Sequence, residues 1–279
     1  MRVVFVLHLV LYAVGSSIFA QPETVKKVDI FSSKEMIEAS VRQVPCERDK
    51  RFEGVRQLFL SLGAPESEIF VETFDKDKIR NVVLRKKGQT DETIVIGAHY
   101  DRTDTGCGVT DNWTGVTIMA HAYKTLRPLK TKKSYVFVAF DQEETGLKGS
   151  SQMLKALPET ETAKICAMVN FDSFGQAYPM ALQNASSPKM LRLAETLGKE
   201  SGFKFYSVEI PGASSDSSSF RSKNIPAVTL SGLGSNWTEI LHSASDKLEN
   251  VKMDSVYIGY RFGVHFLSQL EEAGCSDFR

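Results

Sequence analysis

The stretch SYVFVAFDQEETGLKGS, residues 134–150, joins an apolar run to an acidic exit. An apolar run of this length, rich in β-branched and aromatic residues, is typical of a buried strand. Two adjacent acids, Glu143 and Glu144, follow it shortly afterwards. Acids at the exit of a strand are either ordinary solvated loop residues or part of a site, and the rest of the chain decides between the two.

Other apolar runs alternate with amphipathic segments along the chain. Apolar runs predict strands, and apolar residues spaced by three or four predict helices. We expect strands at 78–88, 93–99, 134–140, 165–171 and 225–231, and helices at 31–44, 49–63, 113–126, 149–157, 187–202 and 251–272. Buried strands alternating with helices predict a three-layer α/β/α sandwich with a largely parallel mixed central sheet.

The first twenty residues have the layout of a secretory signal peptide. Arg2 is followed by an apolar stretch over 3–14, and small residues end at Ala20. An uncleaved anchor is the alternative, but the stretch is shorter than the roughly 20 apolar residues that span a bilayer. We therefore expect a signal peptide at 1–20, a single domain with an N-terminal helical segment at 21–279, and a secreted or periplasmic protein without a membrane anchor after cleavage.

Charge and cysteine content limit the partners and the type of metal site. The chain has 34 basic and 34 acidic side chains, so it has no broad positive field and nucleic acid is not an expected partner. Its four cysteines show no C-x-x-C spacing, which argues against a structural zinc site. Export would permit disulfides in any of three pairings. A free buried thiol is the alternative for Cys166.

Histidine and acids follow three of the expected strands. They are His99 and Asp101 after the strand at 93–99, Glu143 and Glu144 after that at 134–140, and Asp172 after that at 165–171. In open α/β sheets, sites form outside the carboxyl ends of the strands, so these side chains are expected to meet at one edge. Asp111, just before a helix, and His242, in a late polar loop, are further candidates.

Nitrogen and oxygen ligands converging from separate elements suit zinc, and two histidines with three acids suit a two-metal site with a bridging carboxylate. Taken singly, each residue has an ordinary interpretation: Asp111 as a helix N-cap, Asp101 as a turn residue and His242 as a surface histidine. Their joint placement favours a site. His121 and His265 lie on amphipathic helices, and we interpret both as structural.

Six segments occur in an order that resembles the dizinc exopeptidases, a family that includes bacterial leucyl aminopeptidase, plasma glutamate carboxypeptidase and glutaminyl cyclase. The resemblance covers roughly residues 45–272. The segments are GAHYD (97–101), TDNWTGV (110–116), FVAFDQEETGLKGS (137–150), NFDSFG (170–175), SSDSSSFRSKNIPAVTL (214–230) and LHSASDKLENV (241–251).

The resemblance implies a zinc peptidase domain that holds two zinc ions. By its pattern Asp111 is the bridging ligand. Glu144 and His242 would complete one zinc site, and His99 and Asp172 the other.

The resemblance also implies roles for two acids that do not bind metal. Glu143 would be the general base, and Asp101 would orient His99 through the ring nitrogen that faces away from the metal. Asn112 follows the bridging acid in an N-x-T sequon, and we expect it to be buried and to shape the turn into the helix together with Gly115.

Two departures from the family pattern affect the substrate side of the site. The family often has Ser-Asp-His before the strand at 225–231, whereas Asp216 is here followed by Ser217. The segment PGASSD (211–216) also lacks the tyrosine that helps bacterial leucyl aminopeptidase hold its tetrahedral intermediate. The residue that stabilises the oxyanion is therefore not identified.

The sequence favours a secreted zinc exopeptidase, an aminopeptidase acting on peptides, and leaves its oligomeric state open. A carboxypeptidase or dipeptidase of the same family is the alternative, with Arg102 or Arg221 as the cation for a C-terminal carboxylate. Further alternatives are a one-zinc glutaminyl cyclase and a non-catalytic binding module on the peptidase fold.

Overall fold

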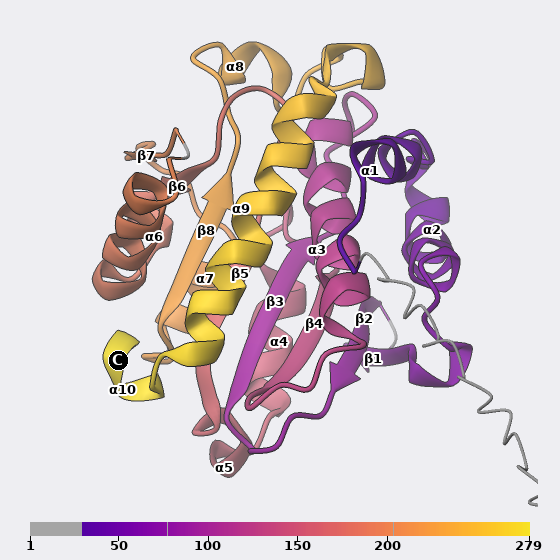
Figure 1. Cartoon of the computed structure of the whole chain (residues 1–279). Helices are drawn as coiled ribbons and strands as arrows, with labels where there is room; N and C mark the ends of the chain where they lie inside the picture. The colour runs from indigo at the N-terminus through magenta and orange to yellow at the C-terminus, as the bar shows by residue number, and fades with distance from the viewer. Residues whose placement is uncertain (1–29, 77, 203) are drawn as a thin grey trace, which may run out of the picture.

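The computed structural model describes residues 30–76, 78–202 and 204–279 (Figure 1). The expected signal peptide at 1–20 lies outside the described residues. In the described part of the chain, no helix is long and apolar enough to cross a membrane.

The centre of the fold is an eight-stranded mixed sheet in the order β1-β2-β4-β3-β5-β8-β6-β7. Its strands are β1 Phe70–Phe74, β2 Ile79–Lys86, β3 Thr93–His99, β4 Ser134–Phe140, β5 Ile165–Phe171, β6 Met180–Leu182, β7 Tyr206–Val208 and β8 Ala227–Ser231. The four central strands β4, β3, β5 and β8 are parallel, whereas β1 with β2, β2 with β4 and β6 with β8 pair antiparallel.

Helices cover both faces of the sheet (Figure 1). The longer ones are α1 Lys34–Val41, α2 Arg48–Ser61, α3 Thr114–Leu126, α4 Lys148–Ala156, α6 Pro188–Glu200 and α9 Met253–Glu272; α5 Glu159–Thr162, α7 Asp216–Arg221, α8 Trp237–Ile240 and α10 Cys275–Phe278 are short. The helices α1, α2, α3, α6 and α9 share one apolar core, and α4 and α7 share another. The predicted three-layer α/β/α sandwich is confirmed.

The two cores explain why the central strands are largely apolar rather than alternating. Val82 and Ile94 point into the core under α3 and α9, while their neighbours Val83 and Val95 point into the core under α4 and α7. A strand covered on both faces buries every residue, so its sequence is a continuous apolar run.

The structure differs from the sequence expectations at the margins of the sheet. The strands expected at 78–88 and 93–99, which a short turn would make neighbours, are separated in the sheet because β4 lies between β2 and β3. The strands β1, β6 and β7 and the short helices α5, α7, α8 and α10 were not expected. At the edge strand β1 the large side chains Phe70 and Val71 are 49% and 41% exposed, and β6 and β7 have only three residues each. An exposed strand and a strand of three residues both lack the continuous apolar run that predicts a buried strand.

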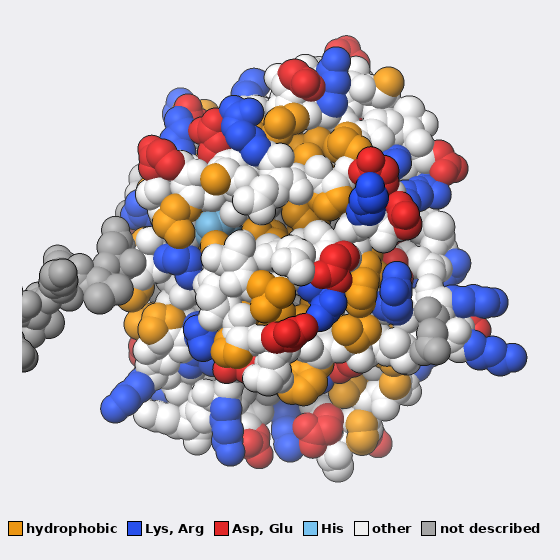
Figure 2. Space-filling model, turned by 90° about the vertical axis from the view of Figure 1, so that its right-hand side faces the viewer, with side chains coloured by type: hydrophobic (Ala, Val, Ile, Leu, Met, Phe, Trp, Pro, Cys, Tyr) orange, Lys and Arg blue, Asp and Glu red, His pale blue; other side chains and the backbone are white. Residues whose placement is uncertain are grey.

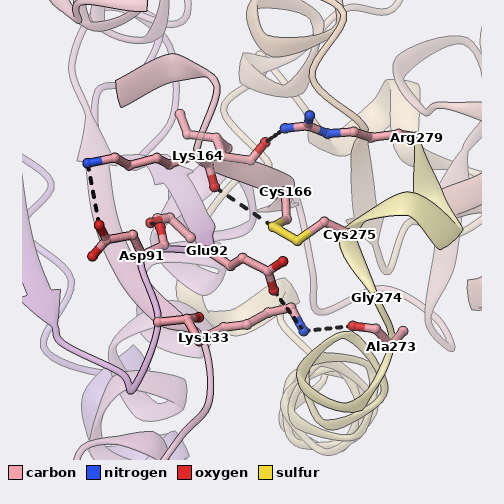
Figure 3. The surroundings of a disulfide bond; sticks show 12 residues. Asp91, Glu92, Lys133, Lys164, Cys166, Ala273, Gly274, Cys275 and Arg279 are labelled. Atoms are coloured by element: carbon pink, nitrogen blue, oxygen red, sulfur yellow. Dashed lines mark hydrogen bonds and ion pairs between the residues drawn. A yellow bond between two sulfur atoms is a disulfide. The ribbon is translucent and has the colours of Figure 1, made fainter. Parts of the chain in front are cut away.

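Two disulfides join distant parts of the chain. Cys46 pairs with Cys107 and Cys166 with Cys275, so the alternative of a free thiol at Cys166 is wrong. The second bond ties the start of β5 to α10, at the amino ends of the central strands (Figure 3).

Charges of both signs are interspersed on the surface that carries α1, α2 and β1 (Figure 2). This distribution agrees with the balanced composition of the chain. On this face a polyanion would meet acidic as well as basic side chains.

Candidate metal centre

His99 is the last residue of β3 and is only 1% exposed. Its Nε2 lies 3.1 Å from Asp111 Oδ1 and 3.6 Å from Asp172 Oδ1, and its Nδ1 lies 3.3 Å from Asp101 Oδ1. Burial alone would lower the pKa of His99, but the surrounding carboxylates, with Glu143 contributing most, raise it well above its ordinary value. The ring therefore lies in a strongly negative environment.

His242 approaches the same carboxylate from the other side. Its Nε2 is 3.1 Å from Asp111 Oδ2 and 3.1 Å from Glu144 Oε2. These hydrogen bonds raise the pKa of His242 to about 10. The side chain of His242 is 58% exposed, whereas that of Asp111 is 7% exposed. Asp111 thus lies between the two histidines, one buried and one at the surface.

The turn before α3 directs Asp111 into the centre. The alternative interpretation of Asp111 as a helix N-cap is wrong, because α3 begins at Thr114 and Asn112 makes the local contacts instead. Asn112 is fully buried, as expected, and its Oδ1 accepts from the main-chain N–H groups of Gly115 and Ser173 over 3.1 Å each. A Cβ on Gly115 would lie 2.2 Å from that Oδ1, so only glycine permits this close approach.

Asp246 holds the same turn and was not identified from the sequence. Its carboxylate accepts from the main-chain N–H groups of Thr110 over 2.7 Å and Asp111 over 3.0 Å. Burial raises the pKa of Asp246 to about 6. The signal for this residue was its place in the same motif as His242, four residues further along the chain.

Asp101 fixes the loop that carries the two adjacent glutamates. Its carboxylate accepts from the main-chain N–H of Glu143 over 3.0 Å and of Glu144 over 3.2 Å. Burial raises the pKa of Glu143 well above its ordinary value, and the carboxylates of Asp172 and Asp216 raise it further. Glu143 is therefore a group that takes up a proton readily.

Asp172 follows β5, and two serines bind its carboxylate. Ser173 Oγ donates to Oδ1 over 3.0 Å and Ser215 Oγ donates to Oδ2 over 2.5 Å. Asn170 in turn donates to Ser215 Oγ over 2.6 Å. Hydrogen bonds of this kind orient a carboxylate that would bind a cation. The structure thus brings together every residue that the sequence analysis placed in the site.

The donor set fits zinc, on two observations. Ligand atoms of His99, Glu143 and Asp172 lie within 4.8 Å of one another, and so do those of His99, Asp111 and Glu144. Glu144 Oε1 is also buried without a hydrogen-bond partner. Carboxylates gathered this closely repel one another unless a cation neutralises them, and nitrogen with oxygen donors suits zinc.

A third group of potential ligands, Glu92 with Cys166 and Cys275, is of a different kind. Its two sulfur atoms form a disulfide and offer no thiolate to a metal.

A cavity of about 640 Å³ opens over the site. Its polar floor includes His99, Asp111, Glu143, Glu144, Asp172 and His242, and its apolar wall includes Leu182, Ile210, Leu233, Trp237 and Leu241. Among the described residues that line it there is no lysine, arginine or tyrosine. The lining therefore combines acidic and apolar side chains.

Neither arginine considered for a C-terminal carboxylate lines this cavity. Arg102 donates to the main-chain carbonyls of Cys46, Thr103 and Gly106. Arg221 donates to the carbonyl of Asn184 and lines a separate cavity near the amino ends of β5 and β8.

The two remaining histidines of the described chain lie outside the centre. His121 is fully buried, and its ring nitrogens lie 2.7 Å from Ser32 Oγ and 2.9 Å from Ser40 Oγ. The interpretation of His121 as structural is confirmed. His265 is half-buried on α9, away from the ligand cluster.

The family model for peptidase family M28 matches residues 81–258, which is more than half of the chain and spans every candidate ligand. The chain belongs to peptidase family M28. The predicted resemblance to the dizinc exopeptidases is thereby confirmed. Aminopeptidase YwaD of Bacillus subtilis is a relative of this M28 chain that is 24% identical over 201 residues, covering 68% of this chain and 44% of the relative. The chain thus spans less than half the length of this curated relative.

Solved structures share the M28 fold with this chain. The zinc aminopeptidase BSAP from Bacillus subtilis matches with a TM-score of 0.63 and 22% identity, covering 71% of this chain and 52% of that one. A glutaminyl cyclase from an Acidobacteriales bacterium matches with a TM-score of 0.74 and 18% identity, covering 91% of this chain and 100% of that one. The fold of this M28 chain is therefore common to peptidases and cyclases, and the distinction between them must come from the site.

Proposed function

We propose that this chain is a zinc-dependent exopeptidase that removes residues from the free N-terminus of peptides. The observation that carries the proposal is the cavity, whose described lining contains a carboxylate-rich floor and no lysine or arginine. A C-terminal carboxylate is typically bound by a lysine or arginine, and the described lining of the cavity has neither, whereas an N-terminal amine needs no such cation. Family membership supports peptide hydrolysis as the reaction, and the lack of lysine and arginine among the described lining residues favours the amino end.

The residues of the centre are assigned to two zinc ions. His99 and Asp172 would hold one ion, His242 and Glu144 the other, with Asp111 shared between them because its two oxygens face different histidines. Zinc bound there would supply a Lewis acid that polarises the scissile carbonyl and lowers the pKa of a bound water.

Glu143 would act as the general base. It would take the proton of the attacking water and deliver it to the nitrogen of the leaving amine. Burial raises the pKa of Glu143, which makes its carboxylate a stronger proton acceptor. Asp101 would support this step in two ways, by fixing the main chain of Glu143 and by facing His99 Nδ1.

The apolar wall would select the side chain of the N-terminal residue. Leu233, Trp237 and Leu241 are part of this wall and line the same cavity as the carboxylates. An apolar side chain placed there leaves water, which contributes about 25 cal/mol per Å² of buried apolar surface. We therefore expect a preference for apolar residues such as leucine at the N-terminus.

Export is part of the proposal. The two disulfides of the described chain are typical of proteins that mature in an oxidising compartment. They support a secreted or periplasmic location, which a signal peptide at 1–20 would provide.

The experiment incubates the zinc-loaded protein with a defined set of peptides and identifies the products by mass spectrometry. The set pairs one leucine-initiated peptide with its N-acetylated and its C-terminally amidated forms, and adds a peptide that begins with glutamine. We expect stepwise loss from the free N-terminus, blocked by acetylation and unaffected by amidation. Loss from the C-terminus, or loss of ammonia from the glutamine peptide without hydrolysis, would contradict the proposal.

A further inference from the structure

Arg51 is a fully buried arginine on α2. Its guanidinium donates only to main-chain carbonyls among the hydrogen bonds of the described chain. Nη1 donates to Pro45 over 3.2 Å and to Cys107 over 3.0 Å, Nη2 donates to Gly108 over 3.1 Å, and Nε donates to Tyr100. One side chain therefore joins the segment at Pro45, close to it in sequence, to Tyr100 and to Cys107 with Gly108, which lie 49 to 57 residues away.

Two of these segments carry candidate zinc ligands. The carbonyl of Tyr100 belongs to the residue between His99 and Asp101, and the carbonyls of Cys107 and Gly108 lie just before Asp111. The guanidinium thus connects the end of β3 with the turn that leads into α3. Its rigid fork of donors can bind several carbonyls at fixed angles, which lysine cannot do.

The third segment is tied to the same place by covalent and aromatic contacts. Cys46, next to Pro45, forms its disulfide with Cys107. The guanidinium carbon of Arg51 also lies 5.5 Å from the ring centre of Trp113, two residues after Asp111. The planar cation is therefore held on one side by the carbonyls and on another by an aromatic ring.

The burial of the Arg51 guanidinium costs free energy, and nearby carboxylates offset part of that cost. Burying an arginine among neutral carbonyls carries a large desolvation penalty. The carboxylates that stabilise the cation from a distance include Asp101, Asp111 and Asp246, all of which belong to the centre. The fold therefore places a fixed positive charge behind a concentrated set of acids.

We propose that Arg51 is a positioning residue of the metal centre, which holds the segment of His99 and Asp101 against the turn of Asp111 and so keeps the zinc ligands in register. This inference rests on the proposed zinc site. Residues that support metal ligands in this indirect way typically change metal affinity by 10- to 100-fold when they are replaced.

The test measures zinc affinity by competition with a chromogenic chelator, in the wild-type chain and in Arg51→Lys and Arg51→Gln. Glutamine removes the charge and most of the donors, and we expect zinc to bind about 10- to 100-fold more weakly. Lysine keeps the charge but fewer of the hydrogen bonds, and we expect a smaller loss. Hydrogen exchange of the segment 98–112 in the zinc-free protein provides a second readout, with faster exchange expected in both variants.

Lys133→Gln is the matched control. Lys133 is also buried and also donates to main-chain carbonyls, to Glu271 over 3.0 Å and to Ala273 over 2.6 Å. It lies near the Cys166–Cys275 disulfide, away from the metal centre (Figure 3). We expect this variant to lose thermal stability and to keep the zinc affinity of the wild type.

The outcomes separate this inference from the proposed function. Wild-type zinc affinity in folded Arg51→Lys and Arg51→Gln, or an equal loss in Lys133→Gln, would overturn the role of Arg51 and leave the zinc site standing. If Arg51→Gln does not fold, Arg51→Lys alone decides between these results. A wild-type chain that binds no zinc would overturn the metal centre itself, and the role of Arg51 with it.

Discussion

Asp246 accepts a hydrogen bond from the main-chain N–H of Asp111 over 3.0 Å, across a sequence separation of 135 residues. The contact joins the loop after His242 to the turn before α3. Asp246 lies four residues after His242. Its contact with Asp111 therefore brings the two loops together where His242 Nε2 lies 3.1 Å from Asp111 Oδ2. The relative position of His242 and Asp111 thus depends on Asp246, a carboxylate that would not itself bind metal.

Replacement of Asp246 by asparagine should destabilise the protein and weaken the site. The amide offers one acceptor instead of two, so one buried main-chain N–H loses its partner, which costs about 1–3 kcal/mol. We expect this loss in the free energy of unfolding from urea titration, together with lower turnover. Asp254→Asn is the control, because Asp254 is an exposed acid whose ion pair with Lys34 contributes little. Equal stability of the two variants would contradict the role given to Asp246.

Trp237 should determine the preference for a large apolar residue at the substrate N-terminus. It is half-buried in the apolar wall of the cavity. We expect Trp237→Ala to lower the ratio of kcat/KM for leucine over alanine substrates about tenfold, since a changed apolar contact is worth about 1–3 kcal/mol. Tyr178→Ala, at an exposed aromatic that does not line the cavity, should leave the ratio unchanged. An unaltered ratio in Trp237→Ala would exclude this wall as the specificity pocket.

His121 should make the stability of the protein sensitive to acid. Burial lowers its pKa to about 3, below the value of about 6.5 expected in the unfolded chain. Between these values the unfolded state binds the proton and the folded state does not, so stability falls as the pH falls from about 6.5 towards about 3. The slope for one proton approaches 1.4 kcal/mol per pH unit.

The variant His121→Gln isolates this contribution. Urea titrations of both proteins at about pH 7.5 and about pH 4.5 should show that the wild type loses more stability than the variant on acidification. Parallel losses would mean that His121 titrates normally in the folded state.

The ligands were predictable because apolar runs mark the strands, and the residues that follow the runs mark one edge of the sheet. His99, Glu144 and Asp172 were identified in this way. The central strands were also predictable because both of their faces are buried. The outer strands β1, β6 and β7 were not, because exposure or short length removes the apolar signal.

The supporting residues were harder to find. Arg51 lies among the charged residues Arg48, Asp49 and Lys50 at the start of α2 and resembles a surface residue of an amphipathic helix. Its partners are main-chain carbonyls, which have no side-chain identity and leave no pattern in the sequence. Asp246 was within a recognised motif, but its partners are main-chain N–H groups, so the same reason applies.

The most direct test of the account is to measure zinc content and aminopeptidase turnover together in Glu143→Gln. The substitution removes the base but none of the five assigned ligands. We predict a loss of turnover of roughly 100- to 10,000-fold, the usual contribution of a general base, with about two zinc ions still bound per chain. A variant that keeps its zinc and turns over at the wild-type rate would contradict the assignment of Glu143 as the base of a zinc aminopeptidase.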